Sequence, residues 1–178
     1  VTAHPDGYYI GLRGNGLLRV NRDGSTETLV EWDANDMTEA GDPNPNYQIF
    51  AWSMARDIRT NEIGIFGFKG GFATWSPEGG LEIHKQADLE NWDGRYAYAG
   101  AVKDGGGWYS LVYALETGEI SIARFNSEQN DWIDRISWSD VDQGAQEFAF
   151  PQGMTINGDH GDYYVTADVA TFSSEFRV

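Results

Sequence analysis

The chain has 178 residues, of which 40% are hydrophobic and 14% aromatic, and this composition favours one folded domain over disorder. Its 28 acidic residues against 12 basic ones give a formal net charge of -16, which disfavours nucleic-acid and anionic-membrane partners because phosphate binding depends on Lys and Arg. It has no Cys, which excludes disulfides and thiolate sites, and no apolar run long enough to span a bilayer.

The first 32 residues predict four short strands joined by tight turns. An apolar stub at residues 1–4 runs into a Pro-Asp-Gly turn, and the aromatic segment "GYYIGL" follows at residues 7–12. After a Gly-rich turn come "LLRVNRDG" at residues 17–24 and "STETLVEW" at residues 25–32. No helical period of useful length occurs, so we expect a meander of antiparallel strands.

This order of segments recurs along the chain, which predicts a repeat protein. The third segment of the unit begins at residues 17, 72, 122 and 175, so successive starts are 55, 50 and 53 residues apart. The predicted units span about residues 1–50, 51–95, 96–148 and 149–178 of a single domain. The last unit has three predicted strands, which end with "EFRV".

Four-stranded units of this period predict an all-β fold, a β-propeller of about four blades. A single meander cannot bury both of its faces, so we expect consecutive blades to stack face to face. An irregular β-sandwich or barrel is the alternative. The first and last units are incomplete, so either the fourth blade closes with three strands, or the chain is a fragment of a larger, six-bladed ring or of a ring completed by another chain; the sequence favours the fragment or two-chain alternative.

Several side chains are predicted to have structural roles. The Gly residues between the second and third segments suit hairpins that need positive φ. We expect the strand tryptophans to pack between blades, and these are Trp75, Trp108, Trp132 and Trp138. An arginine recurs at one position of the third segment and predicts ion pairs, as Arg19, Arg124 and Arg177. The three histidines fit no metal spacing and are predicted at turns or on the surface, at His4, His84 and His160.

The segment "PQGMTINGDHGDYYVTADVATFSSEFRV", residues 151–178, resembles blades of the six-bladed propellers related to gluconolactonases, strictosidine synthase and NHL-repeat proteins. The segments "HPDGYYIGL" and "RVNRDGS" match the same blade pattern more weakly. In the lactonases of that superfamily a divalent cation, commonly calcium, lies at the top of the central channel, so the resemblance implies a calcium site and hydrolase chemistry. Gln152 stands where the family pattern has the Asn of Pro-Asn-Gly.

Three long acidic segments between units are the predicted site, because propellers bind ligands around the channel mouth. They span residues 31–52, 85–96 and 139–153. Aromatic side chains in them predict contacts to a ligand, at Trp52, Trp92 and Tyr96. Carboxylates in them predict ligands for a hard cation such as calcium, at Asp36, Asp93, Asp142 and Glu147.

These features favour a secreted or periplasmic binding module that holds a protein partner, a glycan, a small molecule or a cation on its acidic, aromatic loop face. One alternative is a calcium-dependent, lactonase-like hydrolase with an ion at the channel mouth and loop carboxylates as ligands or base. Another is a structural part of a larger propeller assembly. No nucleophile elbow, phosphate loop or dinucleotide fingerprint is present in the sequence.

Overall fold

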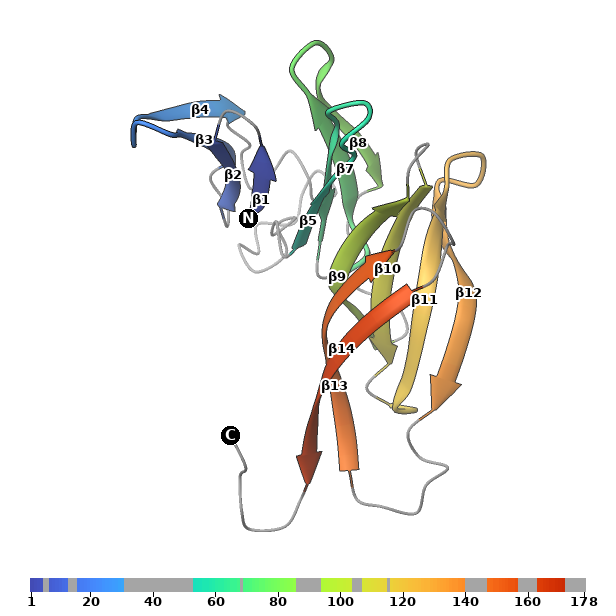
Figure 1. Cartoon of the computed structure of the whole chain (residues 1–178). Helices are drawn as coiled ribbons and strands as arrows, with labels where there is room; N and C mark the ends of the chain where they lie inside the picture. Colours follow the sequence, from blue (N-terminus) through green and yellow to red (C-terminus); the bar gives the residue numbers. More distant parts are fainter. Residues whose placement is uncertain are drawn as a thin grey trace, which may run out of the picture.

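The computed structural model describes residues 1–4, 7–12, 16–30, 53–67, 69–85, 94–103, 107–114, 116–139, 147–156 and 163–171 (Figure 1). These ranges contain 14 strands and no helix, which confirms the all-β prediction. Within them, no helix is long and apolar enough to cross a membrane.

The first two sheets are four-stranded antiparallel meanders, as predicted. The first sheet is built from β1 (Thr2–His4), β2 (Gly7–Leu12), β3 (Gly16–Asn21) and β4 (Thr26–Val30). The second sheet is built from β5 (Ser53–Arg56), β6 (Ile63–Phe66), β7 (Phe72–Ser76) and β8 (Gly80–Lys85).

The third sheet repeats this order with longer strands, and the fourth contains two strands within the described ranges. The third sheet is built from β9 (Arg95–Lys103), β10 (Gly107–Ala114), β11 (Glu119–Asn126) and β12 (Asp131–Ser139). The fourth sheet pairs β13 (Glu147–Ile156) with β14 (Tyr163–Thr171). The predicted third strand of this unit, "EFRV", lies outside the described residues.

Each pair of consecutive sheets encloses its own hydrophobic cluster, so the predicted face-to-face stacking is confirmed. Alternate side chains of a strand point to opposite faces: on β6, Ile63 and Ile65 pack toward the first sheet, whereas Phe66 packs toward the third. On β10, Trp108 packs toward the second sheet and Leu111 toward the fourth. Each inner sheet therefore buries both of its faces.

The first strand of each sheet lies innermost in the stack. Strand β5 contacts β1 on one side and β9 on the other, and β9 in turn contacts β13. With blade-like sheets arranged around these first strands, the fold is that of a partial, propeller-like β structure (Figure 1).

The predicted packing role of the tryptophans is confirmed for Trp75, Trp108 and Trp132, which are all buried. The prediction for His84 is wrong: it lies on β8, its ring stacks on Phe72 with centroids 5.2 Å apart, and its Nε2 is 2.7 Å from the Thr74 hydroxyl. The neighbouring sheet explains why His84 is partly buried, because the Phe125 ring of the third sheet lies 5.9 Å from the His84 ring.

The arginine prediction has a mixed outcome. Arg19 forms an ion pair of 2.6 Å with Glu27 on the adjacent strand, as predicted. Arg124, at the equivalent position of the third sheet, is exposed on β11. Arg177 and His160 lie outside the described residues, as do the side chains of His4 and Trp138.

Candidate functional site

The antiparallel order brings three features of each four-stranded sheet to the same end: the start of the first strand, the second hairpin and the end of the fourth strand. We call this the loop end, and the opposite end, with the first and third hairpins, the turn end. The acidic connections join β4 to β5, β8 to β9 and β12 to β13, so each leaves and re-enters the sheets at the loop end. Figure 1 shows β12 ending and β13 beginning at the lower end of the view.

Five of the predicted site residues lie outside the described residues, and they are Trp52, Trp92, Asp36, Asp93 and Asp142. The structure places the other two, Tyr96 and Glu147, on strands, so the prediction that they belong to loops is wrong. Tyr96 pairs with Tyr113 on β10, and Glu147 pairs with Thr171 on β14. The second and third acidic segments between described strands are therefore shorter than predicted, at residues 86–93 and 140–146, whereas the first keeps its predicted span of residues 31–52.

Tyr96 lies at the loop end beside a cation from the neighbouring sheet. The Lys69 ammonium, from the hairpin between β6 and β7, lies 4.0 Å from the centroid of the Tyr96 ring. At this distance the ring face attracts the ammonium group. One face of the predicted stacking platform is therefore already occupied by a protein side chain.

Two further cations at the loop end form ion pairs that sequence reasoning missed. Arg95, the first residue of β9, pairs with Asp134 on β12 and donates a hydrogen bond of 3.1 Å to the Ser121 hydroxyl. Ser121 also donates to Asp134 over 3.1 Å. Lys85, the last residue of β8, lies 2.7 Å from the Asp131 carboxylate of the third sheet. No short motif marks these pairs, because they join strands that are far apart in the sequence.

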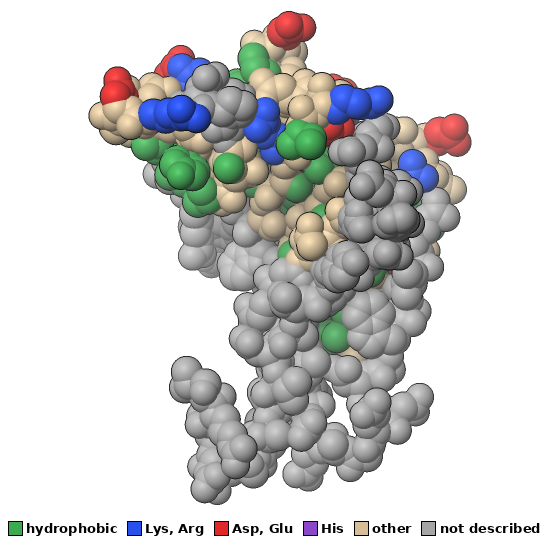
Figure 2. All heavy atoms as spheres, viewed as in Figure 1, with side chains coloured by type: hydrophobic (Ala, Val, Ile, Leu, Met, Phe, Trp, Pro, Cys, Tyr) green, Lys and Arg blue, Asp and Glu red, His purple; other side chains and the backbone are tan. Residues whose placement is uncertain are grey.

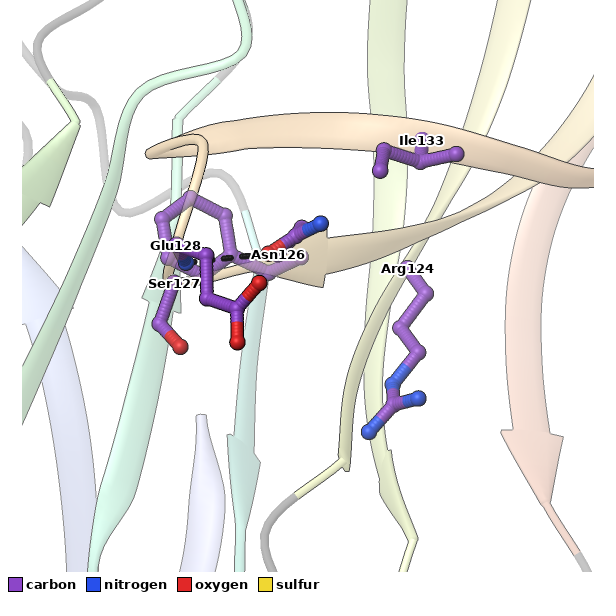
Figure 3. Close-up of a pocket in the computed structure, with 6 residues that line it drawn as sticks. Arg124, Asn126, Ser127, Glu128 and Ile133 are labelled. Carbon is purple, nitrogen blue, oxygen red and sulfur yellow. Dashed lines mark hydrogen bonds between the residues drawn. The ribbon is translucent and has the colours of Figure 1, made fainter.

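Two surface hollows lie at the turn ends of the second and third sheets. One, of about 310 Å³, is at the hairpin between β11 and β12 (Figure 3). There the Asn126 carboxamide oxygen accepts a hydrogen bond of 2.9 Å from the Glu128 backbone N–H, while Arg124 and Ile133 line the opposite side. A second, of about 490 Å³, lies between Asn61 and Glu78 at the turn end of the second sheet.

Neither hollow has the chemistry of a catalytic centre. The described part of the chain contains no group of three His, Asp or Glu residues that could hold a metal ion. The Asn126 side chain closes its own turn, which is the usual role of Asn in a hairpin. The loop end, to which the acidic connections attach, therefore remains the candidate site.

Comparison with protein-family models matches no family, and comparison with curated proteins finds no match. The resemblance to gluconolactonase-type blades accordingly stays a prediction, as does the calcium site that it implies.

Proposed function

We propose that this protein is a β-propeller binding module that holds a positively charged ligand at its loop end. The observation that carries the proposal is topological. All three acidic connections attach to the sheets at this end, because each runs from a fourth strand to the next first strand. The first strands that these connections enter lie side by side, since β5 packs directly against β9, and β9 against β13.

The charge of these connections supports a cationic ligand. Residues 31–52, 86–93 and 140–146 together contain ten acidic residues and no Lys or Arg. The described cations at this end, Lys69, Lys85 and Arg95, already engage Tyr96, Asp131 and Asp134. The loops therefore carry concentrated negative charge, which attracts cations and raises their rate of association.

A cationic ligand is favoured over a glycan at this end. Sugar binding by stacking needs an aromatic face open to the ligand, and Lys69 covers one face of Tyr96. Hard cations and lysine-rich segments need carboxylate oxygens, which the three loops supply in number.

Isothermal titration calorimetry with decalysine, calcium chloride and neutral maltohexaose tests the proposal directly. We expect decalysine to bind with an affinity that falls about tenfold or more as salt rises from about 0.05 to 0.3 M, because salt screens exposed charges. Maltohexaose should give no heat. Saturable calcium binding would extend the proposal to a metal ion and would make the lactonase-like alternative the next hypothesis to assay.

Two matched triple variants test whether decalysine binding depends on the carboxylates of the acidic loops or on the net charge of the whole protein. The first neutralises one carboxylate in each acidic loop, as Asp36→Asn, Asp93→Asn and Asp142→Asn. The second makes the same change in charge at the turn end, as Asp23→Asn, Glu78→Gln and Glu128→Gln. We expect the first to weaken decalysine binding about tenfold and the second less than about twofold. Equal weakening in both, or maltohexaose binding alone, would refute the proposal.

A further inference from the structure

One face of the first sheet is apolar and only partly buried. Tyr8 pairs with Val20 and Ile10 with Leu18 across β2 and β3, so these four side chains share one face, the first-sheet face. Tyr8 is 55% exposed, and the other three are partly buried. Figure 2 shows hydrophobic side chains on the molecular surface over this sheet.

The same four positions are buried in the second sheet. Its register pairs Ile63 with Trp75 and Ile65 with Ala73, which matches the two pairs of the first-sheet face strand by strand. Their exposed fractions are 0%, 6%, 0% and 0%, because the first sheet covers them with Tyr9 and Leu17.

The third sheet repeats this burial. The equivalent positions on β10 and β11 are Trp108, Ser110, Ala123 and Phe125. Trp108, Ala123 and Phe125 pack into the cluster that contains Phe66 and Phe72 of the second sheet, and Ser110 is buried as well. In both inner sheets, these positions form the surface on which the preceding sheet packs.

We propose that the first-sheet face binds a further propeller blade that lies outside these 178 residues. The inter-sheet interface of the structure defines the chemistry of this partner. It is a four-stranded antiparallel sheet that presents aromatic or aliphatic side chains from its second and third strands, as Tyr9 and Leu17 do for the second sheet. The exposed Tyr8 ring and the partly buried aliphatic side chains beside it form an apolar patch of the kind that marks a protein interface. The inference concerns a different surface from the loop end and does not depend on the ligand proposed there.

A second copy of residues 1–52 fused ahead of Val1 is the probe for this interface. It carries the connection that already joins the first sheet to the second, so the added sheet can reach the first-sheet face with native spacing. The chain has no Cys, so Val20→Cys in the original copy provides a single thiol. We expect its reaction with a soluble disulfide reagent to be slowed about tenfold or more by the added sheet, because buried thiols react only after local opening.

Two further thiols complete the test: one at an exposed control position, and one on the surface of the added copy that faces the first sheet. Ile58→Cys, in the turn after β5 where Ile58 is 73% exposed, should react at the same rate with and without the added sheet. Leu17→Cys in the added copy should be protected together with Val20→Cys. If either of these two thiols stays as reactive as Ile58→Cys, the proposal is overturned.

Sedimentation velocity of the unextended chain distinguishes a partner blade from a second copy. The proposal expects a monomer, since the partner is a different sheet and the charge of -16 opposes self-association. A dimer that is lost in Val20→Glu but kept in Ile58→Glu would overturn the proposal, because the first-sheet face would then be an interface between copies.

Discussion

The indole Nε1 of Trp132 donates a hydrogen bond of 2.8 Å to the backbone carbonyl oxygen of Gly70. The bond joins the fourth strand of the third sheet to the second hairpin of the second sheet. Around it, the Trp132 ring lies 5.3 Å from Phe72 and 5.2 Å from Phe125, centroid to centroid. One side chain therefore combines a buried polar contact with the aromatic packing that holds these two sheets together.

Replacing Trp132 should separate these two contributions. Trp132→Phe keeps an aromatic ring but removes the donor to Gly70, and we expect a loss of about 1–2 kcal/mol in the free energy of unfolding. Trp132→Ala also removes the ring and should cost about 3–5 kcal/mol. Urea denaturation measures both, and equal stability of Trp132→Phe and the parent chain would show that the hydrogen bond contributes nothing.

Gly100 on β9 lies where the second and third sheets approach each other closely. A Cβ at this position would overlap the ring of Phe66, and the Gly100 N–H donates a hydrogen bond of 2.8 Å to the Ser53 hydroxyl. Gly100→Ala should therefore destabilise the chain by about 1–3 kcal/mol through overpacking.

Gly79, in the turn before β8, is the matched control for Gly100. There an added Cβ meets the Ser76 hydroxyl at 2.9 Å, and this short side chain can rotate away with the loss of one exposed hydrogen bond, which it accepts from the Gly79 N–H. Gly79→Ala should cost less than about 1 kcal/mol, as surface changes usually do. Thermal denaturation of both variants would contradict the overlap argument if their melting temperatures fell equally.

Asp57 stabilises the turn between β5 and β6. Its carboxylate accepts hydrogen bonds of 2.8 Å from the Arg59 N–H and 3.3 Å from the Thr60 N–H, and the residue is only 1% exposed. Asp57→Ala leaves both donors to water, so we expect a loss of about 1–2 kcal/mol. Asp57→Asn keeps one acceptor oxygen and should lose less, and chemical denaturation that ranks the two variants in the opposite order would contradict this role.

The repeat made most strands predictable, because alternating aromatic and β-branched residues between Gly and Asp turns are a local signal. The starts of β9 and β13 were not predictable in this way. The acidic segment at residues 139–153 is predicted as a loop, and it includes Pro151. In the structure Pro151 pairs with Ala167 and Gly153 with Thr166, and the intervening Gln152 bulges out of the ladder. A bulge is one of the few places where a strand tolerates Pro.

Contacts between sheets were the second limit of sequence reasoning. The sequence predicts His84 at a turn or on the surface because it fits no metal spacing, yet the rings of Phe72 and Phe125 lie against its ring. Tyr96 was predicted as a ligand platform, but its neighbour is Lys69 from a hairpin 27 residues earlier in the chain. These neighbours depend on how the blades stack, and the spacing of residues along one strand does not encode it.

The ion pair between Asp131 and Lys85 should make stability depend on pH in the acid range. Burial alone would raise the pKa of Asp131, but hydrogen bonds from the Lys85 ammonium and the Trp132 N–H, with the charges of Lys85 and Arg95, outweigh it and hold this pKa below its usual 3.8. A carboxylate with a lowered folded pKa contributes stability that is complete above the unfolded pKa and lost as pH falls through the folded one.

Asp131→Asn should therefore be less stable than the parent chain at pH 7 and equally stable at a pH well below 3.8. The Asp131 side chain is 52% exposed, so solvent screens the pair and the difference at pH 7 should stay below about 1 kcal/mol. Urea denaturation across this pH range measures it.

Glu82→Gln, on the same strand as Lys85 and 75% exposed, is the control for loss of a surface charge. A stability difference for Asp131→Asn that persists unchanged in acid would mean that side-chain packing, rather than the carboxylate charge, stabilises this corner of the interface.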